Sequence, residues 1–267
     1  MGSILDEIVA HKREEVAAAR AAEPQERIEA RAAETPRPRN FFKAVTRKGP
    51  TVNVIAEIKR ASPSAGLIRE DFDPVELARA YHGAGAAAIS CLTDERYFRG
   101  SLDYLARIKR AVPLPVLRKD FIIDRYQVYE ARAAGADAIL LIAECLNESE
   151  LVDLLILATQ LQLTVLLEVH DVDQLLKVRP HVGFPHAGYC LLGINNRDLK
   201  TMTTDLQHTL RVIGMVEDTS ILVSESGIRT REDVRRLQQA GVRAVLVGEH
   251  LMKQPDVGEA LRALIGG

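Results

Sequence analysis

Several common signals are missing from this sequence. It contains no tryptophan and only three cysteines among 267 residues, and it has neither a bilayer-spanning apolar run nor the apolar core of a secretion signal at its start. Cys91, Cys145 and Cys190 are widely spaced, lie in or beside apolar segments, and form no CxxC or Cys/His pattern of a metal site. We therefore interpret them as small core thiols, and we expect a soluble, cytoplasmic protein.

Neither sign of charge dominates. The chain has 35 lysines and arginines against 37 aspartates and glutamates, which gives a formal net charge of −2. This balance argues against nucleic acid or a membrane surface as the main partner and leaves a small molecule as the expected ligand. HExxH, EF-hand, Walker and GxGxxG patterns are also absent. The sequence therefore suggests no metal and no nucleotide cofactor.

From residue 52 onward, short apolar segments alternate with amphipathic ones. The apolar segments are rich in Val, Ile and Leu, which is typical of parallel strands that are buried on both faces. The expected strands are 52–58, 86–92, 115–118, 137–142, 163–168, 189–194, 220–224 and 243–247. The expected helices are 74–83, 101–111, 125–134, 147–161, 171–178, 205–214, 230–240 and 256–265. Eight such units in a chain of this length predict an α/β fold, a closed (β/α)8 TIM barrel, rather than an open doubly wound sheet.

The first 50 residues do not follow this alternation. They predict a helix from Ile4 to about Ala22 and a second at 24–33, followed by a proline break. We expect residues 1–50 to form a helical extension packed on a barrel of residues 51–267, and a solvated tail is the alternative. Phe41 and Phe42 then provide an apolar anchor before the first strand. From that pattern we expect residues 37–48 to cover part of the mouth of the barrel.

The first strand carries two charges into an apolar run. Glu57 and Lys59 alternate with apolar residues, so their side chains share one face of the strand. Burying either charge alone is costly, and both therefore need a partner or a ligand. A carboxylate and an amine at the C-terminal end of a strand can supply an acid–base pair. The alternative is a structural salt bridge.

Polar and charged groups also follow most of the other strands. In barrels of this class the active site lies at the C-terminal ends of the strands, so these groups should meet on one rim. The groups are Lys119 after the third strand, Glu168 in the fifth, Asn195 and Arg197 after the sixth, Ser226 and Gly227 after the seventh, and Gly248 and Glu249 after the eighth. Buried charges at these positions are unusual unless they are paired or functional. For His170, His250 and Asp120 we expect structural, solvated or locally paired roles.

The turns after the last two strands predict an anion site. Glycine in Ser226-Gly227 and Gly248-Glu249 lets the backbone approach a ligand, and helix N-termini present N–H groups to an anion. Barrels often bind phosphate at this place. The alternative is two ordinary strand–helix turns.

Six segments resemble the indole-3-glycerol-phosphate synthase family. They are 55–64 (IAEIKRASPS), 117–122 (LRKDFI), 167–170 (LEVH), 193–199 (GINNRDL), 224–228 (SESGI) and 246–249 (LVGE). The first is highly specific, whereas the last two are shared more loosely with other phosphate-binding barrels. The resemblance extends over nearly the whole chain. It implies a carbon–carbon lyase that closes the ring of an anilino-deoxyribulose phosphate, with loss of CO2 and water, in tryptophan biosynthesis.

The resemblance also implies roles for individual residues. Lys119 matches the general acid at the substrate carbonyl, while Lys59, Glu57, Glu168 and Asn195 match further catalytic groups. How proton transfers divide among Lys59, Glu57 and Glu168 stays open. The residues that match substrate-binding positions are Ser62, Phe121, Arg197, Ser226, Gly227, Leu246, Gly248 and Glu249. Among them, Arg197 and Phe121 match positions near the substrate's carboxylate and aromatic ring. We expect Glu249 to contact phosphate through its backbone alone, because its carboxylate would repel that group.

Two other readings of the rim stay open. One is a different sugar-phosphate barrel, such as a Schiff-base aldolase or a thiazole synthase, in which a lysine would attack the substrate. The other is a phospholigand-binding barrel without catalysis. Two lysines and two glutamates can supply the acid–base steps of ring closure without a cofactor. Association with other enzymes of tryptophan biosynthesis is a further expectation.

Overall fold

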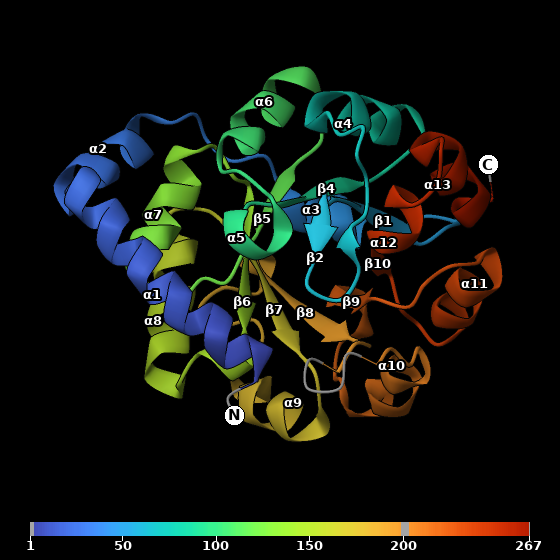
Figure 1. The fold of residues 1–267 in the computed structure, drawn as a ribbon. Coiled ribbons are helices and arrows are strands. Elements are labelled where there is room, and N and C mark those ends of the chain that lie inside the picture. The colour runs from blue at the N-terminus through green and yellow to red at the C-terminus, as the bar shows by residue number, and fades with distance from the viewer. Residues whose placement is uncertain (1–2, 199–202, 267) are drawn as a thin grey trace.

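Residues 3–198 and 203–266 are described by the computed structural model. They form a closed barrel of eight parallel strands surrounded by helices (Figure 1). The strands follow the order β1-β10-β9-β8-β7-β6-β5-β4 around the barrel. Their bounds are β1 (Asn53–Ile58), β4 (Ala88–Leu92), β5 (Val116–Lys119), β6 (Ala138–Ile142), β7 (Thr164–Val169), β8 (Cys190–Asn195), β9 (Leu222–Glu225) and β10 (Ala244–Val247). The predicted TIM barrel is confirmed, and each strand begins and ends within two residues of its predicted bounds.

The helices of the barrel also match the predicted alternation. They are α4 (Pro74–Gly83), α6 (Asp103–Ala111), α7 (Arg125–Ala133), α8 (Glu148–Gln160), α9 (Val172–Val178), α10 (Gln207–Val212), α11 (Arg231–Gln239) and α13 (Val257–Ile265), with the short α5 (Glu95–Phe98) and α12 (Glu249–Met252) at strand ends. The sequence did not predict α5 or the antiparallel hairpin of β2 (Ala61–Ser62) and β3 (Gly66–Leu67). Gly85, Gly135 and Gly241 follow α4, α7 and α11 at φ of +91°, +88° and +97°, which is the left-handed geometry that glycine adopts easily after a helix.

Apolar side chains fill the interior of the barrel. Each strand contributes at least one residue to this layer: Ile55, Ala88, Leu117, Ala138, Leu166, Leu191, Val223 and Ala244. The interior is therefore a packed core rather than a pore, as in other barrels of this class. Because side chains alternate along a strand, the next inward residues toward the C-terminal ends include the charged Glu57, Lys119, Glu168 and Glu225. The charged layer thus rests on an apolar floor.

The N-terminal region begins with two helices that pack on the outside of the barrel, α1 (Ile4–Ala22) and α2 (Gln25–Glu34). Figure 1 shows α1, in blue, running beside α7, which it contacts. Ile8 and Ile28 are buried, and Tyr126 of α7 donates its hydroxyl hydrogen bond to the carbonyls of Ala19 and Glu23. The solvated-tail alternative is therefore wrong for these helices. The division of the chain at residue 50 stays a prediction.

A third helix, α3 (Phe41–Thr46), lies at the N-terminal end of the barrel. This end is opposite the C-terminal strand ends that carry the charged layer. Phe41 and Val45 join the interior apolar cluster, and Asn53 at the start of β1 donates to the carbonyls of Val45 (2.8 Å) and Arg47 (2.9 Å). The expectation that residues 37–48 cover the mouth is therefore wrong. The predicted apolar anchor is confirmed for Phe41, which is buried, whereas Phe42 is half-buried, and the anchor lies at the N-terminal end of the barrel instead of at the mouth.

The remaining sequence signals concern membranes, thiols and metals. Within the part of the chain that the structure describes, no helix is long and apolar enough to cross a membrane. The cysteines are free, with Cys91 and Cys190 buried and Cys145 half-buried, so the core-thiol interpretation is confirmed for two of them. Residues 3–198 and 203–266 contain no group of three His, Cys, Asp or Glu side chains placed to hold a metal ion.

Candidate active site

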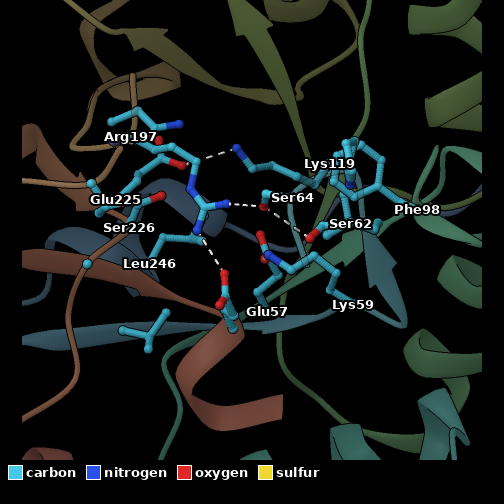
Figure 2. A pocket seen from close by; sticks show the side chains of 18 of the residues that line it. Glu57, Lys59, Ser62, Ser64, Phe98, Lys119, Arg197, Glu225, Ser226 and Leu246 are labelled. Atoms are coloured by element: carbon cyan, nitrogen blue, oxygen red, sulfur yellow. Dashed lines mark hydrogen bonds and ion pairs between the residues drawn. The ribbon is translucent and has the colours of Figure 1, made fainter. Parts of the chain in front are cut away.

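A cavity of about 410 Å³ opens at the C-terminal ends of the strands. Every site residue predicted from the sequence lines it: Glu57, Lys59, Ser62, Lys119, Phe121, Glu168, Asn195, Arg197, Ser226, Gly227, Leu246, Gly248 and Glu249. Figure 2 shows labelled members of this set pointing into one space from separate strands. The structure thus brings the predicted residues together, while their individual roles stay predictions. Leu199, at the end of one family-like segment, lies outside the described residues.

Lys119 stands at the bottom of the cavity between two carboxylates. It is the last residue of β5, and its Nζ donates to Glu168 Oε2 of β7 (2.6 Å) and to Glu225 Oε2 of β9 (3.1 Å). These three side chains are 13%, 3% and 2% exposed. Closure of the barrel produces the contact, because inward residues of non-adjacent strands face one another across its axis.

Burial and charge set the protonation of this group. Burial alone would lower the pKa of Lys119, but the carboxylates of Glu168, Glu225 and Glu57 outweigh it and raise that pKa. Burial likewise favours neutral Glu168, yet the Lys119 ammonium and the adjacent His170 hold its pKa well below the usual range. For Glu225, burial and the negative Glu168 raise the pKa well above the usual range. One ammonium thus balances one carboxylate, and Glu225 is the neutral acid of the pair.

Glu57 and Lys59 form a second ion pair in the same cavity. Lys59 Nζ lies 2.7 Å from Glu57 Oε1, which confirms that the two side chains share a face. Gly248 of the neighbouring strand end makes room for this pair. A Cβ added to Gly248 would lie 3.0 Å from the Cβ and 2.8 Å from the Cδ of Glu57. Position 248 therefore needs glycine because Glu57, a catalytic candidate, leaves no room for a side chain there. This need is separate from any that a ligand imposes.

Asn195 links the bottom of the cavity to its mouth. Its Nδ2 donates to Glu168 Oε1 (3.2 Å), and its Oδ1 accepts the backbone N–H of Arg197 (3.0 Å). His170 is buried behind Glu168, with its Nε2 3.2 Å from Glu168 Oε1, although the contact lacks hydrogen-bond geometry. His170 does not line the cavity, whereas His250 does, at the rim.

Arg197 spans the mouth of the cavity. Its Nη1 donates to Ser64 Oγ (2.6 Å), a bond that Figure 2 marks with a dashed line, and its Nη2 donates to Glu249 Oε2 (2.8 Å). Lys253 Nζ donates to the other Glu249 oxygen (2.7 Å). Burial would raise the pKa of Glu249, but hydrogen bonds from Lys253 and Arg197 lower it to about 2. The Glu249 carboxylate is therefore engaged with cations, a role that the sequence did not reveal.

The two turns predicted to bind phosphate lie side by side at the rim. Ser226 and Gly227 have φ of +67° and +78°, and a Cβ on Gly227 would lie 2.8 Å from Thr204 Cγ2. A left-handed serine is strained, and such strain is concentrated at functional sites. Gly248, just after the neighbouring strand β10, precedes the four-residue helix α12. Both turns line the cavity that holds Lys119.

Several cavity residues were not predicted. Glu225 carries the same signal as Glu57, a carboxylate at the end of an apolar strand, but it was not assigned to the site. Ile4, Leu5 and Ile8 of α1 line the cavity, so α1 provides the cover that was expected from residues 37–48. Phe98 of α5 packs on Phe121 with ring centroids 6.1 Å apart. No local pattern in the sequence places these apolar residues at the mouth.

Asp120 does more than the local pairing expected of it. Its carboxylate accepts from Thr93 Oγ1 (2.6 Å) and Arg118 Nη2 (3.1 Å), and it lies 3.0 Å from Nζ of Lys12 in α1. Lys12 is 3% exposed and also pairs with the buried Asp94 (2.8 Å). This buried cluster anchors α1 beside the cavity.

Comparison with known proteins agrees with this geometry. The family model described as indole-3-glycerol phosphate synthase matches residues 5–264. The chain is 49% identical to the indole-3-glycerol phosphate synthase of Rhodospirillum rubrum, with 100% of each chain covered. It is 48% identical to that of Rhodopirellula baltica, which covers 98% of this chain and 99% of the relative.

Solved structures of lower similarity share the fold. A mutant tryptophan synthase alpha-subunit from Pyrococcus furiosus superposes with a TM-score of 0.59 at 13% identity, covering 81% of this chain and 99% of that one. A 3-hexulose-6-phosphate synthase gives a TM-score of 0.60 at 16% identity, covering 79% of this chain and 97% of that one. At such identities the likeness concerns the barrel alone. The family model and the relatives that match along their full length show that this chain belongs to the indole-3-glycerol phosphate synthase family.

Proposed function

We propose that the cavity carries out the reaction for which the family is named. The substrate is 1-(2-carboxyphenylamino)-1-deoxyribulose 5-phosphate, and the products are indole-3-glycerol phosphate, CO2 and water. The protein would then act as a carboxy-lyase of tryptophan biosynthesis. The observation that carries this proposal is the buried Lys119 ammonium, held between Glu168 and Glu225 in the cavity that also contains the Glu57–Lys59 pair.

Ring closure needs an acid at the substrate ketone. The aromatic carbon that bears the carboxylate bonds to the ketone carbon, and the ketone oxygen gains electrons and takes a proton. The raised pKa of Lys119 keeps this side chain charged at neutral pH, so its ammonium can stabilise the developing alkoxide and then donate the proton. The bond to the carboxylate then breaks, CO2 leaves, and its electron pair restores the aromatic ring.

Dehydration needs a second acid and a base. The new hydroxyl leaves as water after taking a proton, while the adjacent carbon loses a proton and the indole double bond forms. Lys59, Glu57 and Glu168 are within the same cavity and are the candidates for these two roles. Glu168 is ionised, which suits a base. Asn195 holds the carboxylate of Glu168 by a hydrogen bond and would keep it aimed at the substrate.

Binding of the substrate would use the rim. Phe121, packed on Phe98, offers a flat apolar wall for the aromatic ring, and Arg197 offers a guanidinium for the carboxylate. Ser62 and Leu246 line the space between them. The glycine turns at 226–227 and 248–249 would receive the phosphate. A product complex whose phosphate lies elsewhere would contradict this placement.

The Schiff-base alternative requires a neutral lysine as the nucleophile. The carboxylates around Lys119 favour its charged form instead, so the acid role suits it better. The test is to add the anilino-deoxyribulose phosphate and to follow indole fluorescence, which rises over a low background because the chain has no tryptophan. Borohydride added during turnover should leave the protein unlabelled. Covalent labelling would favour the aldolase type, and no turnover would favour a binding protein.

We also expect the protein to act in the cytoplasm. Association with other enzymes of tryptophan biosynthesis stays a prediction. Co-purification of the chain with those enzymes at physiological salt would test it.

A further inference from the structure

The ion pair at the mouth joins three separate segments. Arg197 follows β8, Ser64 lies in the loop of the β2–β3 hairpin, and Glu249 begins α12. The guanidinium reaches both partners, at 2.6 Å and 2.8 Å. Figure 2 shows the guanidinium of Arg197 and its bond to Ser64 beside the space that holds Glu57 and Lys119. Glu249 lines the same cavity, so a ligand that fills this cavity meets the contact between Arg197 and Glu249.

The charge of Glu249 is permanent under ordinary conditions. Hydrogen bonds from Lys253 and Arg197 keep its pKa at about 2, so neutral pH does not release Arg197. Both side chains are partly open to solvent, at 21% and 26% exposure. Exchange of one carboxylate for another at such a site costs little, because water screens the pair. A second carboxylate that reaches Arg197 can therefore displace Glu249 from it.

We infer that Glu249 is a specificity-determining residue that occupies Arg197 in the free protein and competes with the carboxylate of the substrate for it. This inference rests on the proposed function, in which Arg197 receives that carboxylate. A ligand without the carboxylate cannot compete and leaves the Arg197–Glu249 contact in place. A ligand that carries it must pull Arg197 away from Glu249, so each binding event includes the loss of this contact. Glu249 thus lowers the affinity for ligands that carry the carboxylate, leaves the affinity for other phosphorylated ligands unchanged, and so sets how strongly the site prefers one class over the other.

Two unreactive ligands provide the test. One is the substrate with its ketone reduced to an alcohol, and the other is the same molecule with phenyl in place of 2-carboxyphenyl. Their dissociation constants are measured by calorimetry for the wild type, Glu249→Gln, Arg197→Met and the double variant. Glu76→Gln is the matched control, because Glu76 pairs with Arg79 at 2.6 Å on α4, away from the cavity.

We expect Glu249→Gln to lower the dissociation constant of the carboxylated ligand about three- to tenfold, as for loss of one competing ion pair. The phenyl ligand should bind the variant and the wild type equally, and Glu76→Gln should change neither constant. In the Arg197→Met background, Glu249→Gln should have no effect, since the competition needs the guanidinium.

Two outcomes would overturn the inference. Weaker binding of the carboxylated ligand to Glu249→Gln would mean that Glu249 holds Arg197 in its productive position. Equal tightening for both ligands would mean that Glu249 repels the phosphate in general. The proposed function fails separately, if the wild-type protein does not convert the substrate.

Discussion

The bottom and the mouth of the cavity handle charge in opposite ways. At the bottom, Lys119, Glu168 and Glu225 are almost fully buried, and one lysine faces two acids. At the mouth, Arg197 and Lys253 share Glu249 and stay partly exposed. Buried groups respond by shifting protonation, whereas exposed groups respond by exchanging partners. This difference indicates that the bottom carries out the chemistry and that the mouth selects the ligand. Variants at the bottom should therefore change mainly turnover, and variants at the mouth should change mainly binding.

The largest effect is expected at the bottom. Lys119→Met keeps the volume of the side chain and removes its charge, so turnover should fall by a factor of about 10² to 10⁴, as for loss of a positioned general acid. The Michaelis constant should change much less, because the rim still holds the substrate. Lys119→Arg should not restore turnover, since the planar guanidinium fork does not place a donor where the compact ammonium does. Stopped-flow fluorescence checks both variants, and near-native turnover by folded Lys119→Met would make its charge structural.

The two acids beside Lys119 should differ. Glu168→Gln removes an ionised base and the main counter-charge of Lys119, so turnover should fall about 10²-fold or more. Glu225→Gln replaces a neutral acid by a neutral amide of similar shape, and the loss should stay below about tenfold. Steady-state rates at pH 7 compare them directly. Equal losses would show that Glu225 also works in its ionised form.

The free energy of unfolding should also depend on pH because of Glu225. The pKa of Glu225 is raised in the folded state. When the pH is above the pKa of Glu225 in the unfolded chain, the folded protein therefore still holds a proton that the unfolded chain has lost. Stability is then fully present at low pH and declines as pH rises from about 4.5 toward the folded pKa, by at most about 1.4 kcal/mol per pH unit. Urea unfolding between pH 5 and 8 should show a smaller decline for Glu225→Gln than for the wild type. Parallel curves would contradict the protonated state.

Gly248 joins the two regions, and its replacement should show an intermediate effect. In Gly248→Ala the new methyl would meet Glu57 at its Cβ and Cδ, so the carboxylate must move from its place beside Lys59. We expect kcat/KM to fall about ten- to a hundredfold, with turnover affected as well as binding, because misplacement of about 1 Å at a catalytic group is expensive. Gly214→Ala, where a Cβ has open space, is the matched control. A change confined to KM would mean that the glycine serves the ligand alone.

The smallest effect is expected at the mouth. Ser64→Ala removes one of the two hydrogen bonds that hold Arg197 and leaves the bottom untouched. The Michaelis constant should fall about two- to threefold, on the scale of one net hydrogen bond. Initial rates over a range of substrate concentrations suffice. A change in turnover instead would break the separation between mouth and bottom.

The architecture and most of the polar residues of the site were predictable because local rules govern both. Apolar β-branched runs specify buried strands, and inward residues at their C-terminal ends meet whatever the details of packing are. What the sequence could not predict depends on distant partners. The neutral state of Glu225 depends on Glu168 across the barrel, and the engagement of Glu249 depends on Arg197 from another loop. Phe41 was predictable as buried, but the end of the barrel that it fills was not.

The position of helix α3 has a consequence for how the substrate enters the cavity and how the products leave it. Phe41 and Val45 pack into the interior apolar cluster at the N-terminal end of the barrel, and the described residues that line the cavity open it at the C-terminal end. Indole-3-glycerol phosphate, CO2 and water would all leave through the opening by which the substrate arrives. The bulky product must therefore leave this opening before the next substrate can enter it.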